Sequence, residues 1–177
     1  MAETRDPEHV KNLVDRCFER LVLDIAAFGG RVDKIVGDAI LALFGAPLAH
    51  EDDAERAVRA GLAMQRTLSD WATTDDERAL RLRIGINTGE VLVGALRAGG
   101  DYTAMGDVVN SASRLQTAAQ PGQVLVGPTT VAATRGVVEY TSLGPLTVKG
   151  REEPIEVCVA EKVLLPPGAR PNRGRAP

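Results

Sequence analysis

The sequence lacks the features that mark several large classes of protein. Its 177 residues carry a formal net charge of −3, so no excess of positive charge would attract nucleic acid or an anionic membrane surface. The longest uninterrupted apolar run, Ala39–Phe44, is far shorter than the roughly 20 residues that span a bilayer. No charged start leads into an apolar stretch, so we expect no secretion signal. A soluble protein without nucleic-acid or membrane partners is indicated.

Cysteine is scarce as well, with only Cys17 and Cys158. The first falls on the apolar side of an expected helix and the second in a late expected strand, which indicates two buried thiols in a reducing compartment. We therefore expect a cytoplasmic location. A Gly-x-x-x-x-Gly-Lys-Ser/Thr loop, a His/Cys metal spacing and a Ser-His-Asp arrangement are also missing. The two histidines, His9 and His50, are interpreted as surface residues.

What is present suits one globular domain, with 44% hydrophobic and 25% charged residues. Apolar residues at spacings of three and four predict helices near residues 7–28, 53–68 and 107–119. Alternating stretches predict strands near 30–44 (a hairpin), 80–87 and 91–96 (a second hairpin, turning at 88–90), 123–127, 137–141, 146–149 and 155–159. The polar residues 71–77 predict a loop. This order predicts an α+β sandwich in which helices cover a mainly antiparallel sheet. We place the domain at residues 1–163 and a flexible Pro/Arg-rich linker or tail at 164–177; a basic nucleic-acid-binding arm is the minor alternative.

The expected hairpin at Gly30–Phe44 turns at Gly37-Asp38, a pair that accepts the positive φ values of a tight turn. Alternation puts Val32, Lys34 and Val36 on one face of its first strand, where a lysine calls for an anionic or polar neighbour. At the tip, the carboxylate of Asp38 can reach a divalent cation. The alternative is an edge-strand lysine that discourages aggregation and an aspartate chosen for turn geometry.

Two further positions allow a functional and a plain interpretation. Asn110 and Arg114 lie one turn apart on the same face of the third helix, so they can act together or be an ordinary polar pair on a solvated face. Lys149, which precedes Gly150, can contact a ligand or simply belong to a turn.

Four segments together resemble the catalytic domain of the class III nucleotide cyclases, the adenylate and guanylate cyclases. They occur in the family's order and span Pro7 to Ala160: Val32–Asp38, Arg83–Gly89 with Val91 and Gly94, Met105–Leu115, and Val148–Gly150. The resemblance implies the family's ferredoxin-like α/β sandwich. It also implies conversion of ATP to 3′,5′-cyclic AMP and pyrophosphate at a site shared between two subunits.

The resemblance implies roles for the matching residues. Asp38 looks like the second of two aspartates that hold the catalytic metals, two Mg²⁺ or Mn²⁺ ions. Lys34 and Thr103 stand where the family reads the purine; a lysine donor and a threonine acceptor match adenine and mismatch guanine, which favours ATP. Three more residues match the asparagine that orients the ribose, the arginine that stabilises charge on the α-phosphoryl group, and the lysine that contacts the terminal phosphates: Asn110, Arg114 and Lys149.

The family's domain normally begins with a strand that supplies the other metal aspartate, and this chain is expected to enter the domain after it. We consider, in order, a misassigned start, a piece cut from a longer protein, and a degenerate subunit that completes its site with a partner. The expected protein is an adenylate cyclase acting as a homodimer or as a heterodimer with a complete cyclase subunit. The alternative is a catalytically silent cyclase-like module that binds nucleotide or regulates.

Overall fold

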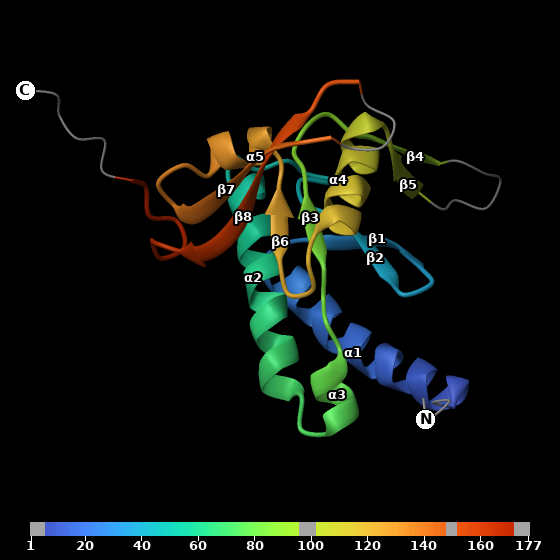
Figure 1. Ribbon diagram of the computed structural model, residues 1–177. Coiled ribbons are helices and arrows are strands. Elements are labelled where there is room, and N and C mark those ends of the chain that lie inside the picture. The colour runs from blue at the N-terminus through green and yellow to red at the C-terminus, as the bar shows by residue number, and fades with distance from the viewer. Residues whose placement is uncertain (1–5, 96–101, 148–151, 172–177) are drawn as a thin grey trace, which may run out of the picture.

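The computed structural model describes residues 6–95, 102–147 and 152–171 (Figure 1). Along the chain these residues form α1 (Pro7–Ala27), β1 (Arg31–Val36), β2 (Ala39–Leu43), α2 (Asp53–Trp71), α3 (Asp75–Ala79), β3 (Ile84–Ile86), β4 (Leu92–Ala95), β5 (Tyr102–Met105), α4 (Asp107–Ala118), β6 (Val124–Val126), α5 (Pro128–Ala133), β7 (Val138–Leu146) and β8 (Ile155–Val163). Within these residues no helix combines the length and the apolar composition needed to cross a lipid bilayer.

The first helix follows directly from its sequence. The carboxylate of Asp6 accepts a hydrogen bond from the backbone N–H of Glu8 (3.1 Å), and Pro7 occupies the first helical turn, where its missing N–H costs nothing. The buried residues recur every four positions and face α2 and the β1–β2 hairpin: Leu13, Cys17, Leu21 and Ile25. Burial raises the pKa of the Cys17 thiol, and both cysteines are free thiols.

Four strands form the central sheet in the order β3-β6-β8-β7. The β3–β6 pair is parallel, whereas β6–β8 and β7–β8 are antiparallel. Alternate residues of β6 serve two cores. Val124 and Val126 pack toward Val58 of α2, and Leu125 packs toward Leu115 of α4. The sheet therefore lies between α2 on one face and α4 on the other, as the α+β sandwich prediction requires (Figure 1).

The predicted hairpin is present as the antiparallel pair β1–β2. Gly37 has φ = 59° and is the turn residue with positive φ; Asp38 does not share that conformation. A β-bulge between Val32 and Lys34 interrupts the alternation, so that Val32 packs near the α1–α2 core while Lys34 and Val36 are exposed. The expectation that all three share one face is therefore wrong, because an extra residue on one strand changes the side to which the following residues point.

The pairing of β3 also differs from expectation. The sequence predicts an antiparallel hairpin of residues 80–87 with 91–96, but β3 pairs in parallel with β6, and β4 pairs with β5. The segment Thr88-Gly89-Glu90 does redirect the chain, yet a turn signal does not say which strand comes next in the sheet. As a result, β4 and β5 form a separate two-stranded sheet.

A short helix was missed between the second helix and β3. Residues 71–77 are polar and read as a loop, but α3 begins after Thr74 with a reciprocal capping box. The Thr74 hydroxyl accepts from the Glu77 N–H (3.2 Å), and the Glu77 carboxylate accepts from the N–H groups of Thr73 (2.8 Å) and Thr74 (3.1 Å). These backbone donors, Thr73 first, lower the pKa of Glu77 to about 2.

Helix α4 lies directly on the main chain of β3 at Gly85. A Cβ added there would collide with the carbonyl oxygen of Ala112 and the backbone nitrogen of Gln116. Only glycine permits this approach, which lets helix and strand touch without an intervening side chain. The depth of α4 above the sheet is thus set by backbone contact.

The described part of the C-terminal segment lies against the domain. Leu165 packs beside the α2-facing core, and its carbonyl accepts a hydrogen bond from the buried guanidinium of Arg59 (2.8 Å). Arg59 also bonds Glu55 within α2 (2.8 Å). The division into a domain at 1–163 and a linker or tail at 164–177 stays a prediction.

Candidate functional site

Lys34 and Asp38 are positioned by the β1–β2 hairpin. Lys34 follows the bulge on β1, and Asp38 stands at the tip beside Gly37, where the chain reverses. Both side chains are exposed. The hairpin is anchored on its other side, where Val32 and Ile40 pack near the core shared by α1 and α2. The anchored hairpin therefore holds the exposed side chains of Lys34 and Asp38 at its surface.

Asn110 and Arg114 each precede a buried residue of α4 and are turned from it by about 100°, so they flank the buried face of the helix. Ser111 and Leu115 point inward at 5% and 1% exposure, whereas Asn110 is exposed and Arg114 is half-buried. Within the described residues neither Asn110 nor Arg114 has a side-chain hydrogen bond or ion pair. An amide and a guanidinium are thus held one turn apart on a helix whose depth is set at Gly85, and both can bind a ligand.

Strand β5 brings the two regions together, since it packs against both β1 and α4. It contains Thr103, whose backbone pairs with Gly94 of β4; its side chain lies outside the description. The predicted phosphate-contacting Lys149 also lies outside the described residues. The elements that carry Lys34, Thr103, Asn110 and Arg114 are consequently neighbours, although residues 34 and 114 are 80 positions apart in the chain.

The described residues do not form a complete metal centre. No group of three or more histidine, cysteine, aspartate or glutamate side chains among them could hold an ion. Asp38 supplies one exposed carboxylate, a donor type suited to Mg²⁺ or Mn²⁺. One carboxylate alone does not fit the requirement for two ions.

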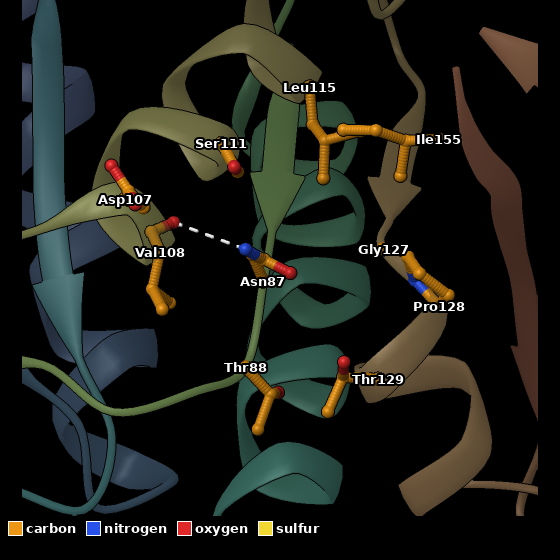
Figure 2. Close-up of a pocket in the computed structure, with 10 residues that line it drawn as sticks. All are labelled: Asn87, Thr88, Asp107, Val108, Ser111, Leu115, Gly127, Pro128, Thr129 and Ile155. Atoms are coloured by element: carbon orange, nitrogen blue, oxygen red, sulfur yellow. Dashed lines mark hydrogen bonds between the residues drawn. The ribbon is translucent and has the colours of Figure 1, made fainter. Parts of the chain in front are cut away.

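Sequence reasoning missed a cavity of about 200 Å³ beneath α4 (Figure 2). It lies between the inward face of that helix, the segment after β3, the start of α5 and Ile155 of β8. Of the predicted site residues whose side chains the structure describes (Lys34, Asp38, Asn110 and Arg114), none lines it. Among its lining residues are Asn87, Ser111, Leu115 and Gly127. No spacing signal could have found it, because its walls come from four segments that meet only in the folded chain.

Comparisons with known proteins agree with this architecture. Residues 1–161 match the model of the adenylate and guanylate cyclase catalytic domain. Adenylate cyclase 1 of Rhizobium meliloti (strain 1021) is 33% identical over 164 residues, which cover 89% of this chain and 25% of that protein. The chain spans between a quarter and a third of the length of the first curated relatives it matches.

Solved structures of both substrate types are similar to this chain. The adenylyl cyclase CyaB from P. aeruginosa has a TM-score of 0.81 at 29% identity, with 91% of this chain and 86% of that chain covered. The guanylyl cyclase Cya2 has a TM-score of 0.85 at 32% identity, with 94% and 87% covered. The layered sheet, the adjacent β1, β5 and α4, and these similarities lead to one assignment: the chain belongs to the family of class III adenylate and guanylate cyclase catalytic domains.

Proposed function

We propose that the chain is an adenylate cyclase catalytic domain that converts ATP to 3′,5′-cyclic AMP and pyrophosphate. The ribose 3′-oxygen forms a new bond to the α-phosphorus, the bond from that phosphorus to the pyrophosphate oxygen breaks, and the 3′-hydroxyl proton is released. The observation that carries the proposal is the packing of β5 against both β1 and α4, which gathers the elements of the base-reading and phosphate-binding residues.

The choice of ATP rests on the hydrogen-bonding pattern of two residues. The ammonium group of Lys34 can donate to adenine N1, and a threonine hydroxyl at position 103 can accept from the exocyclic amine. Guanine carries a donor at N1 and an acceptor at O6, so both contacts would be mismatched. The chain is nearly equally identical to an adenylate cyclase and to a guanylyl cyclase, so overall identity does not favour ATP or GTP. The preference for ATP is therefore argued from Lys34 and Thr103.

Three residues are proposed to act on the sugar and the phosphates. Asn110 orients the ribose by hydrogen bonding, and Arg114 donates to the α-phosphoryl oxygens as negative charge builds up there. Lys149 contacts the terminal phosphates. The exposure of Asn110 and the partial exposure of Arg114, beside the buried face of α4, are what such contacts require. Asp38 would supply one carboxylate of the metal-binding set of this metal-dependent family.

A site shared between two chains is the second part of the proposal. Apolar side chains are exposed on β1 and β4: Ile35 (53%), Val36 (64%), Leu92 (77%) and Val93 (39%). The two hairpins adjoin, because β5 pairs with β4 and also packs against β1. A surface of this kind on neighbouring elements suits coverage by another protein chain, here a second cyclase subunit.

The test combines this chain with a full-length relative whose arginine at the position of Arg114 has been changed to alanine. We expect cyclic AMP from ATP and Mn²⁺ to appear on mixing, because the partner contributes its metal carboxylates and this chain contributes Lys34 and Arg114. Activity should survive Asp38→Ala in this chain and fall about 10²–10³-fold with Arg114→Ala. A folded heterodimer that makes no cyclic AMP would instead favour the silent nucleotide-binding or regulatory module.

A further inference from the structure

The cavity beneath α4 has a closed inner end and an open rim. Ser111, Leu115 and Ile155 line it and are 5%, 1% and 9% exposed, whereas Asp107 and Thr129 are exposed lining residues. Figure 2 shows Ser111, Leu115 and Ile155 around a common space between α4, the end of β3 and the start of α5, with Asp107 at its edge. The cavity is therefore accessible from solvent and reaches to the inward face of the helix.

Every polar side chain in the described lining offers an acceptor oxygen, and the hydroxyl groups can donate as well. The amide nitrogen of Asn87 donates to the Val108 carbonyl (3.2 Å), which leaves the amide oxygen to face the other wall, as Figure 2 shows. A Cβ at Gly127 would lie 2.7 Å from that oxygen, so the glycine keeps this space open. The Ser111 hydroxyl and the Asp107 carboxylate add two further acceptors.

The charge of the lining decides which ligands suit it. The described lining residues include the carboxylate of Asp107 and no lysine, arginine or histidine. Among the described residues an anionic ligand would therefore meet like charge without a compensating side-chain cation, whereas an ammonium group would meet acceptor oxygens. The remaining walls, including Leu115 and Ile155, are apolar. About 200 Å³ is below the 300–1,000 Å³ usual for drug-sized ligands, so the fitting molecule is small.

We propose that this cavity binds a small organic amine, with its ammonium group donating to the acceptor oxygens and its alkyl chain lying against Leu115 and Ile155. The same helix carries Asn110 and Arg114, each next in the chain to a lining residue, Ser111 or Leu115. A bound amine thus contacts α4 from within and changes the position of those two side chains. The movement of Asn110 and Arg114 would affect catalysis only if the proposed cyclase function holds. The movement itself can be measured without any catalysis.

The first experiment compares three probes of similar shape by NMR titration of the ¹⁵N-labelled chain at pH 7. The probes are 3-methylbutan-1-amine, 3-methylbutan-1-ol and 4-methylpentanoate, which are cationic, neutral and anionic. We expect saturable shifts of the backbone amides at 87–88, 108–115 and 127–129. The amine should bind about tenfold or more tightly than the carboxylate, because one charge-assisted hydrogen bond is enough to produce a difference of that size in Kd. Equal or tighter binding of the carboxylate, or no saturable shift with any probe, would overturn the proposal.

Two variants test whether the probes bind inside the cavity. Asp107→Asn should weaken the amine toward the affinity of the alcohol and leave the alcohol unchanged, because only the charge is removed. Ser111→Leu should abolish binding of all three probes by filling the inner end. Its matched control, Ser113→Leu, adds the same side chain at an exposed position of α4 and should leave binding intact. Undiminished binding by folded Ser111→Leu would refute the site; if that variant fails to fold, Asp107→Asn decides.

The effect on α4 has its own readout. The side-chain amide signal of Asn110 and the guanidinium signal of Arg114 should shift with the same saturation curve as the backbone amides. Absence of that shift while the amine binds would refute the coupling. Failure of the chain to make cyclic AMP would refute the proposed function and leave the binding result untouched.

Discussion

The central sheet and the two hairpins use apolar residues in opposite ways. In the sheet, Val126 and Val157 are completely buried, whereas Val36 on β1 and Leu92 on β4 are 64% and 77% exposed. Burial of apolar surface is the main source of folding free energy, so the sheet with its covering helices holds the domain together. The hairpins contribute less to stability and leave apolar surface free for another molecule.

The proposed functional residues follow the same division. Lys34 and Asp38 lie on the β1–β2 hairpin and Thr103 on β5, while the sheet strands contain none of the proposed site residues. Asn110 and Arg114 stand beside the buried face of α4, where Asn110 is exposed and Arg114 is half-buried. We infer that stability and function are assigned to different parts of this fold, and the following variants test that separation.

The largest effect is expected from the pair of base-reading residues. Replacing Lys34 by Glu and Thr103 by Cys should reduce turnover of ATP severely and narrow its advantage over GTP. Mismatched hydrogen bonds in a site that reads a base can cost up to about 10⁴–10⁵-fold. The unfolding midpoint should hardly change, because both positions lie on hairpins. Initial rates with each nucleotide and a thermal melt give the comparison; an unchanged preference for ATP would mean that the base is read elsewhere.

A core substitution should show the reverse pattern. Leu125→Ala in β6 removes a side chain that is 1% exposed, and we expect a loss of about 2–5 kcal/mol in the free energy of unfolding. Ile35→Ala on β1, where the side chain is 53% exposed, should cost no more than about 0.5 kcal/mol. Urea denaturation of both variants provides the measurement. Similar losses would show that the hairpin is as important to stability as the sheet.

The exposed apolar surface should matter for association. Leu92→Ser is expected to raise the Kd for dimerisation about fivefold, equivalent to about 1 kcal/mol, because a leucine of β4 no longer packs against the partner. Leu143→Ser on β7, a residue that is 50% exposed, serves as the matched control and should leave the Kd unchanged. Sedimentation equilibrium at several concentrations measures both. Equal effects would argue that the dimer surface is not at the hairpins.

The smallest effect concerns α3, which belongs to neither region. The folded pKa of Glu77 is about 2, below its ordinary value of 4.5, so its ionised form stabilises the fold fully above about pH 4.5. That contribution is lost as pH falls through about 2. The melting temperature of Glu77→Gln should therefore lie below that of the wild type at pH 7, and the gap should shrink between pH 4.5 and 2. Asp75→Asn, at an exposed neighbouring residue, should change the melting temperature little at any pH. If the difference in melting temperature between Glu77→Gln and the wild type does not depend on pH, the charge of Glu77 does not have the proposed role.

Much of the fold was predictable from local pattern. The periodicity of Leu13, Cys17, Leu21 and Ile25 gave α1, since one face of a helix must meet the core. The Gly37-Asp38 pair gave the β1–β2 turn in the same way. Such features depend on residues that are close in the sequence, so the sequence contains their signal.

The errors concern strand partners and strand length. The partner of β3 is β6, nearly 40 residues away, and no local pattern records it. The sequence also predicts two strands where β7 is continuous, because Gly144 and Pro145 interrupt the pattern. Since β7 is the edge strand of its sheet, a proline without an N–H can be accommodated there. The sequence predicts a strand around Lys34 and a helix around Asn110. It does not predict that both elements pack against β5, because that depends on the tertiary fold.

The contact at Gly85 has a consequence for how this domain can vary. Where a helix rests on side chains, its height above a sheet changes in small steps as those side chains grow or shrink. Here α4 rests on the main chain, and even the methyl group of alanine would collide with Ala112 and Gln116. The height of α4 above the sheet is thus fixed at this contact, and the distance that the Arg114 side chain can reach depends on that height. A substitution at Gly85 therefore cannot change that reach in small steps, so sequence variation must act on it through other residues.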